Sequence, residues 1–135
     1  VKRLVEEAHA AGIKLAIAST SNERGVRLIA RWVLGEAFDY FDAVLAGDVV
    51  SRKKPDPEIY LLAARTLQVD PAECCVVEDS ENGFQAAQKA GMHCVVTRSQ
   101  YSQDEHFPGA DLVVDSLAGS AGPVTIAAIK SFFTA

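Results

Sequence analysis

The sequence predicts a three-layer α/β domain built on a parallel sheet. Five short runs rich in Val, Ile, Leu, Ala and Cys do not alternate with polar residues, as expected of strands that are covered on both faces. Helix-length segments separate these runs, and this alternation is typical of a parallel sheet with right-handed crossovers. In such sheets ligands bind beyond the carboxyl ends of the strands, so a site is expected in the loops that begin there.

The predicted elements follow from these patterns in chain order. Strands are expected at 13–18, 43–46, 74–77, 93–97 and 112–114, and helices at 4–11, 22–34, 56–67, 82–90 and 123–133. Gly12, Gly35 and Gly91 directly follow three of the helices, where a C-cap glycine is favoured. The second helix carries apolar residues at helical spacing, namely Val26, Ile29, Ala30, Val33 and Leu34. Residues 100–109 are a predicted loop, and 119–123 lead into the last helix.

Length and charge limit the classes of function. The chain has 135 residues and a formal net charge of -5, so we expect one domain over 1–135 with an ordinary core and no nucleic-acid partner. No apolar run approaches the roughly 20 residues that span a bilayer, and the start has no signal-peptide core. We therefore expect a soluble intracellular protein with no membrane partner, and we expect Val1 to be a cut within a longer chain.

The cysteines and histidines do not predict a metal site or a disulfide framework. Three cysteines, Cys74, Cys75 and Cys94, fall in or beside predicted strands without CxxC spacing, which favours buried reduced thiols. His9, His93 and His106 share no spacing that suggests a metal or a catalytic triad, and structural or solvated roles are expected.

Three polar groups follow predicted strands and should meet at one edge of the sheet. The first, Ser19-Thr20-Ser21-Asn22, joins a strand to a helix start, where hydroxyls, free N–H groups and the helix dipole favour an anion. The same residues are also good helix caps, with Glu23 adding first-turn charge, so Ser21 or Asn22 has a structural interpretation as well. A phosphate cradle and a helix cap both remain open.

Lys54 is the second group, in the segment Lys54-Pro55-Asp56-Pro57. The prolines fix φ angles and would aim the ammonium group at an anion with little loss of entropy. The segment also makes sense as a helix start with Asp56 as its cap, in which case Lys54 is a solvated lysine. The two interpretations are compatible.

Glu78 and Asp79 form the third group, directly after an apolar strand. Two adjacent carboxylates repel each other where the dielectric is low, and a hard cation such as Mg²⁺ relieves that repulsion. Capping of the next helix by Asp79 or Ser80 is the structural alternative. Because anion donors, a cation and an acidic pair all follow strands, one shared site explains them better than three coincidences.

The pattern resembles the haloacid dehalogenase superfamily. The resemblance rests on Ser19 after an apolar strand, on Lys54 before Pro55, and on Val76-Val77-Glu78-Asp79-Ser80 followed by Gly83, and it covers about residues 1–118. It implies Mg²⁺-dependent phosphoryl transfer on a Rossmann-like core, in which an aspartate attacks phosphorus. It further implies that Ser19 and Thr20 bind the phosphoryl group, that Lys54 neutralises charge, and that Asp79 binds Mg²⁺, with Glu78 reaching it directly or through water.

Within the superfamily, residues 47–55 and 99–102 look most like the CbbY-like branch, whose members are similar to phosphatases of pentulose bisphosphates. Sugar phosphates or bisphosphates are therefore the expected substrates. Ser21 and Asn22 are expected to reach a distal phosphate. A photosynthetic eukaryotic source would imply a plastid location.

The sequence departs from this family in one important respect. The strand ending in Asp-x-Asp-Gly-Thr, which carries the nucleophile, is absent, and so is the cap domain. We expect the sheet to lack its central first strand, between the strands at 13–18 and 74–77, and the chain alone to be inactive. The missing segment would belong to a longer protein or to a separate chain. A non-catalytic binding module and a phosphomutase fragment are the alternatives.

Overall fold

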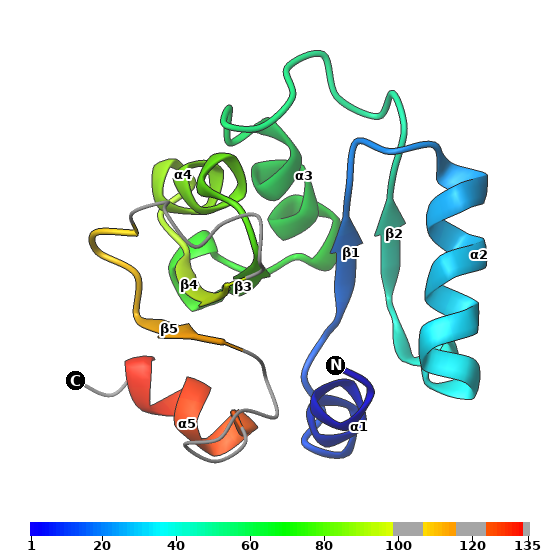
Figure 1. Cartoon of the computed structure of the whole chain (residues 1–135), viewed down its shortest axis with the longest axis horizontal. Coiled ribbons are helices and arrows are strands. Elements are labelled where there is room, and N and C mark those ends of the chain that lie inside the picture. The colour runs from blue at the N-terminus through cyan, green and yellow to red at the C-terminus, as the bar shows by residue number, and fades with distance from the viewer. Residues whose placement is uncertain (99–106, 116–123, 134–135) are drawn as a thin grey trace.

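The computed structural model describes residues 1–98, 107–115 and 124–133 (Figure 1). The strands are β1 (Ala16–Ala18), β2 (Ala43–Leu45), β3 (Cys75–Glu78), β4 (His93–Thr97) and β5 (Leu112–Val114). The helices are α1 (Lys2–Ala10), α2 (Glu23–Leu34), α3 (Glu58–Leu67), α4 (Glu81–Lys89) and α5 (Ile126–Lys130), with 3-10 helices at Gly35–Tyr40, Pro71–Glu73 and Ser131–Phe133. Every strand pair is parallel, which confirms the predicted α/β class.

The strands form two separate sheets. β1 pairs with β2, and β3, β4 and β5 form a second sheet in that order. Figure 1 shows the two groups apart, and no ladder joins β1 to β3 in the part of the chain that the structure describes. The break lies where the sequence predicts a missing central strand. Val77, an apolar residue inside β3, is 42% exposed.

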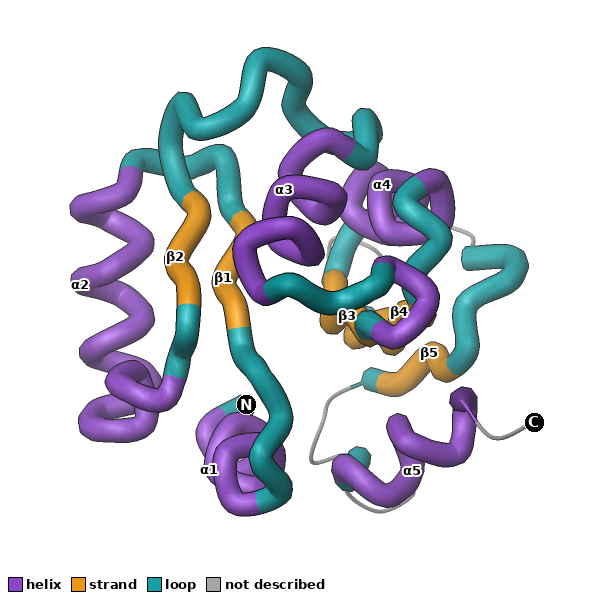
Figure 2. Tube along the Cα trace, turned by 180° about the vertical axis from the view of Figure 1, so that it is seen from behind, coloured by secondary structure: helices purple, strands orange, loops and turns teal. Residues whose placement is uncertain are grey.

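Two helices connect the sheets, one on each face. From α3, Ile59 lies in the same buried cluster as Val76 of β3, and Ala18 of β1 packs against that cluster. From α1, Leu4 packs with β4 and α5, whereas Val5 packs with the end of α2. Figure 2 shows α3 and α4 on one side of the strands and α1 and α5 on the other. The three predicted layers are therefore present despite the break in the sheet.

Several predicted boundaries were wrong. β1 begins at Ala16 rather than at 13, because the Leu15 N–H donates to the Asp42 carboxylate at 2.8 Å instead of joining a ladder. β3 extends to Glu78, which pairs with Val96. The 3-10 helices at Gly35–Tyr40 and Pro71–Glu73 were not predicted. Residues 100–106 of the predicted loop, residues 119–123 and His106 lie outside the described residues.

The apolar stripe of α2 forms a helix as predicted but is mostly uncovered. Leu34 is the one residue of α2 that is buried, whereas Ile29 is 64% exposed and Val33 49%. The stripe faces a groove of about 550 Å³, lined also by Ile17 of β1 and by Val1. Across the described ranges, no helix is both long and apolar enough to cross a membrane.

Candidate functional site

Lys54 lies at the centre of the candidate site, at the break between the sheets. Its Nζ donates to Glu78 Oε1 at 2.5 Å and to the carbonyl oxygen of Ala18 at 3.2 Å. Both side chains are largely shielded, with 20% of Lys54 and 10% of Glu78 exposed. One ammonium group therefore links the last residue of β1 to the last residue of β3.

The loop before α3 is fixed by hydrogen bonds from its own residues. The Glu58 carboxylate accepts the N–H groups of Ser51 at 3.2 Å and Arg52 at 2.8 Å, which ties the loop to the start of α3. Asp56 Oδ1 accepts the Glu58 N–H at 3.0 Å, but α3 begins at Glu58 and its N-cap residue is Pro57 rather than the predicted Asp56. The Lys54–Pro55 peptide is cis. Lys54 itself is not the solvated lysine of the helix-start interpretation, because it is largely shielded and paired with Glu78.

The Glu78 carboxylate has two further neighbours. Tyr60 of α3 donates its hydroxyl to the same Oε1 that Lys54 contacts. A Cβ built on Gly83 would overlap the Glu78 carboxylate, so only glycine leaves room for it there. Burial, followed by the charge of Glu78, raises the pKa of the Tyr60 phenol, which keeps it a hydrogen-bond donor.

Tyr60 was not among the site residues predicted from the sequence. A tyrosine on the apolar face of a helix needs a partner for its hydroxyl when it is buried, and that requirement is the signal that was available. The partner was not predictable, because the pairing depends on how α3 packs on β3.

Asp79 differs from Glu78 in having an exposed carboxylate. Within residues 1–98, 107–115 and 124–133 the Asp79 carboxylate makes no hydrogen bond or ion pair. Ser80 rather than Asp79 caps α4, since its Oγ accepts the Gly83 N–H at 3.1 Å. No group of three or more His, Cys, Asp or Glu side chains suited to a metal occurs among the described residues. Asp79 is thus the carboxylate left available to a cation.

The segment from Ser19 to Asn22 is partly used by local structure. Asn22 Oδ1 accepts the Gly25 N–H at 3.2 Å, which confirms the capping interpretation for Asn22. Ser19 Oγ accepts the Ser21 N–H at 3.1 Å, and this leaves the hydroxyl proton of Ser19 free to donate. The N–H of Thr20 has no backbone partner in the described part of the chain. Two donors therefore remain beside the end of β1.

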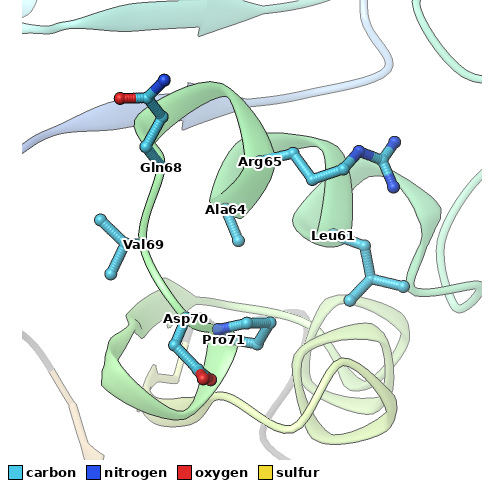
Figure 3. Close-up of a pocket in the computed structure, with 7 residues that line it drawn as sticks. All are labelled: Leu61, Ala64, Arg65, Gln68, Val69, Asp70 and Pro71. Atoms are coloured by element: carbon cyan, nitrogen blue, oxygen red, sulfur yellow. The ribbon is translucent and has the colours of Figure 1, made fainter.

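A second hollow, of about 410 Å³, lies between the end of α3 and the following 3-10 helix. Figure 3 shows that the polar ends of Arg65 and Gln68 point away from each other, while Leu61, Val69 and Pro71 supply apolar walls. Ligand sites normally have convergent polar groups, and this hollow does not.

The cysteines and two of the histidines have structural surroundings. All three thiols are free; Cys94 is buried, and Cys74 and Cys75 are half-buried. Burial raises the pKa of Cys75 and of Cys94 to about 12, so both stay protonated at neutral pH. His93 Nδ1 lies 2.9 Å from Asp111 Oδ1, and His9 stacks on Tyr40.

The model of the haloacid dehalogenase-like hydrolases matches residues 1–91. The chain belongs to that family. It is 51% identical over 117 residues to a CBBY-like protein of Arabidopsis thaliana, covering 87% of this chain and 37% of the relative. It is 44% identical over 120 residues to Protein CbbY of Cereibacter sphaeroides, covering 88% and 52%. The chain therefore spans only about a third to a half of these relatives.

A solved structure agrees with this assignment. The crystal structure of CbbY from Rhodobacter sphaeroides with phosphate superposes with a TM-score of 0.86 at 40% identity, covering 95% of this chain and 56% of that one. A variant of the same protein in complex with xylulose-1,5-bisphosphate gives a TM-score of 0.84 at 41% identity, covering 93% and 55%. The family and the Rossmann-like fold predicted from the sequence are both confirmed.

Proposed function

We propose that this chain is the partial core, over residues 1–135, of a Mg²⁺-dependent phosphatase that hydrolyses a sugar phosphate or a pentulose-type bisphosphate. The observation that carries the proposal is the placement of Lys54 between the ends of β1 and β3, where it contacts Glu78, the residue that precedes the exposed Asp79 in the chain. The bisphosphate bound to the similar CbbY variant supports the substrate class. We also propose an intracellular location, in a plastid if the source is a photosynthetic eukaryote.

In this proposal different residues donate hydrogen bonds to the phosphate and neutralise its charge. The Ser19 hydroxyl and the Thr20 N–H donate to the transferring phosphoryl group, and Lys54 supplies positive charge. Catalysis of this kind depends mainly on positioning and on neutralising charge. Ser21 and the amide nitrogen of Asn22 reach a distal phosphate; the oxygen of Asn22 is already used in the cap.

Asp79 is the proposed Mg²⁺ ligand, and the donor set fits that ion. Mg²⁺ takes one or two carboxylates and keeps several waters, and Asp79 offers an exposed carboxylate. Glu78 Oε1 is engaged by Lys54 and Tyr60, so Glu78 contributes through its other oxygen or through water. When bound, the ion would offset negative charge on the phosphate.

A segment outside these 135 residues supplies the nucleophilic aspartate in this proposal. No Asp-x-Asp-Gly-Thr sequence occurs in the chain, and within the described residues β1 and β3 belong to separate parallel sheets with no ladder between them. That segment is either joined to this chain or a separate partner. The chain alone is accordingly expected to lack turnover.

Release of phosphate from a panel of sugar phosphates, including xylulose-1,5-bisphosphate, tests this function. The chain alone is compared with a longer chain that includes the nucleophile segment, with and without Mg²⁺. We expect activity only in the longer form, with the rate reduced at least about a hundredfold by Asp79→Ala. Glu36→Ala, an exposed carboxylate in the 3-10 helix Gly35–Tyr40, is the control.

The outcomes separate the alternatives. Inactivity of both forms, with phosphate still bound, would favour a non-catalytic binding module. Conversion of one sugar phosphate to its isomer without release of phosphate would favour a phosphomutase.

A further inference from the structure

Tyr60 contacts both members of the central ion pair. It is 5% exposed, its hydroxyl donates to Glu78 Oε1, and Lys54 Nζ lies 4.8 Å from the centre of its ring. A cation above a tyrosine ring face is attracted to it, more strongly where water is excluded. Tyr60 therefore restricts the ammonium through its ring and the carboxylate through its hydroxyl.

We propose that Tyr60 is a positioning residue that fixes the Lys54 ammonium for its phosphate ligand. This rests on the proposed function of the site. A lysine has three N–H donors, and within the described residues two of them go to Glu78 Oε1 and to the Ala18 carbonyl. The third N–H is then held in one direction, available to an oxygen of the ligand.

The third N–H of Lys54 keeps one direction only if Glu78 is itself immobile. A carboxylate that is free to turn would carry the ammonium with it. The Tyr60 hydroxyl holds Oε1, and the closeness of Gly83 leaves the carboxylate no space to turn toward α4. Glu78 therefore acts as a fixed support for Lys54, and Tyr60 is what fixes it.

A purely structural role for Tyr60 makes a different prediction. If the hydroxyl merely satisfied its own need for a partner, its removal would affect stability but not the mobility of Lys54. Tyr60→Phe separates the two roles, because it keeps the ring and its packing and removes only the hydroxyl. Tyr40→Phe is the matched control, since Tyr40 stacks on His9 away from the site.

The experiment uses the chain as it exists, with inorganic phosphate as the probe. NMR of selectively labelled lysine reports whether the two Hε protons of Lys54 are inequivalent, as they are when the ammonium is fixed. A titration with phosphate gives the dissociation constant. In Tyr60→Phe we expect the Hε signals of Lys54 to merge and the dissociation constant to rise roughly tenfold. Tyr40→Phe should change neither.

The result that overturns the proposal is a Tyr60→Phe variant in which Lys54 keeps distinct Hε signals, whatever happens to its thermal stability. Glu78→Gln removes the charge of the carboxylate that holds the Lys54 ammonium, so it should also merge the Lys54 Hε signals. This second variant provides a test if Tyr60→Phe does not fold. If the unmodified chain does not bind phosphate but Tyr60→Phe still frees Lys54, phosphate fails as the ligand of Lys54 in this chain, whereas the positioning role of Tyr60 stands.

Discussion

The two sheets of this molecule form a closed half and an open half. In the closed half, which comprises β3, β4, β5 and α4 with the connecting helix α3 packed on them, the side chains of Ile59, Val95 and Val96 are fully buried. In the open half, which comprises β1, β2 and α2, the helix buries only Leu34 and exposes Trp32. Both halves have the same strand and helix patterns in sequence. Periodicity thus predicts that a helix forms, whereas burial depends on whether another surface is present to cover it.

The first turns of α2 and α4 have similar caps but different surroundings. α2 is capped by Asn22 and α4 by Ser80, and each cap accepts the N–H of a glycine three residues later. A Cβ on Gly25 would meet open space, but a Cβ on Gly83 would meet Glu78. Equivalent local structure therefore has different surroundings in the two halves.

The largest effect is expected from truncating an isoleucine in each half. Ile59→Ala in α3 should lower the free energy of unfolding by about 2–5 kcal/mol, because it leaves a cavity in the core. Ile29→Ala in α2 should change it by less than about 0.5 kcal/mol, since Ile29 is mostly exposed. Urea unfolding measures both. Equal costs would mean that the groove beside α2 is closed in solution.

Alanine substitutions at Gly25 and Gly83, whose N–H groups donate to the two helix caps, should have opposite effects on stability. Gly25→Ala should stabilise the chain by about 0.5–1 kcal/mol, as expected for a helix position with free space. Gly83→Ala should destabilise it by about 1–3 kcal/mol, because the methyl group displaces a carboxylate held by Lys54 and Tyr60. Thermal unfolding of the pair checks this. Stabilisation by both would show that Glu78 moves freely.

The buried Cys94 makes the closed half sensitive to high pH. Its folded pKa is raised to about 12 by burial, whereas an unfolded thiol ionises near 8.5. The protonated thiol thus favours the folded state fully below about pH 8.5, and this contribution is lost as pH rises toward 12, by at most about 1.4 kcal/mol per pH unit. Urea midpoints between pH 8 and 11 should fall less steeply in Cys94→Ala. An identical slope in that variant would contradict the prediction.

The smallest effect on stability is expected at Trp32. Trp32→Ser should change the free energy of unfolding by about 0.5 kcal/mol or less, because the ring is almost fully exposed. Since Trp32 is the single tryptophan, its fluorescence should be strongly quenched by iodide in the folded chain. Protection from iodide in a longer chain would show that added residues cover α2.

The sequence predicted the fold better than it predicted burial. Non-alternating apolar runs located all five strands, because parallel strands are covered on both faces. Gly12, Gly35 and Gly91 have positive φ angles, as their places after helices indicate. The exposure of Ile29 was not predictable from spacing, because the surface that would cover it is not part of the local pattern.

The candidate site was predicted in part. The structure brings Lys54 onto Glu78, two residues chosen from the sequence because both follow strands. It also shows that Asn22 is a helix cap. The different situations of Glu78 and Asp79 depend on Tyr60, which contacts Glu78 from the buried face of α3, and adjacency in sequence carries no information about that contact.

The Lys54 side chain also joins the ends of two strands that belong to different sheets. No backbone ladder sets the distance between β1 and β3 in the described part of the chain, yet one ammonium group contacts Ala18 on one side and Glu78 on the other. A single lysine side chain thus joins the two strand ends directly, and it extends from a loop that Glu58 closes. Replacing Lys54 would therefore remove a direct link between the two strand ends as well as alter the charge of the site.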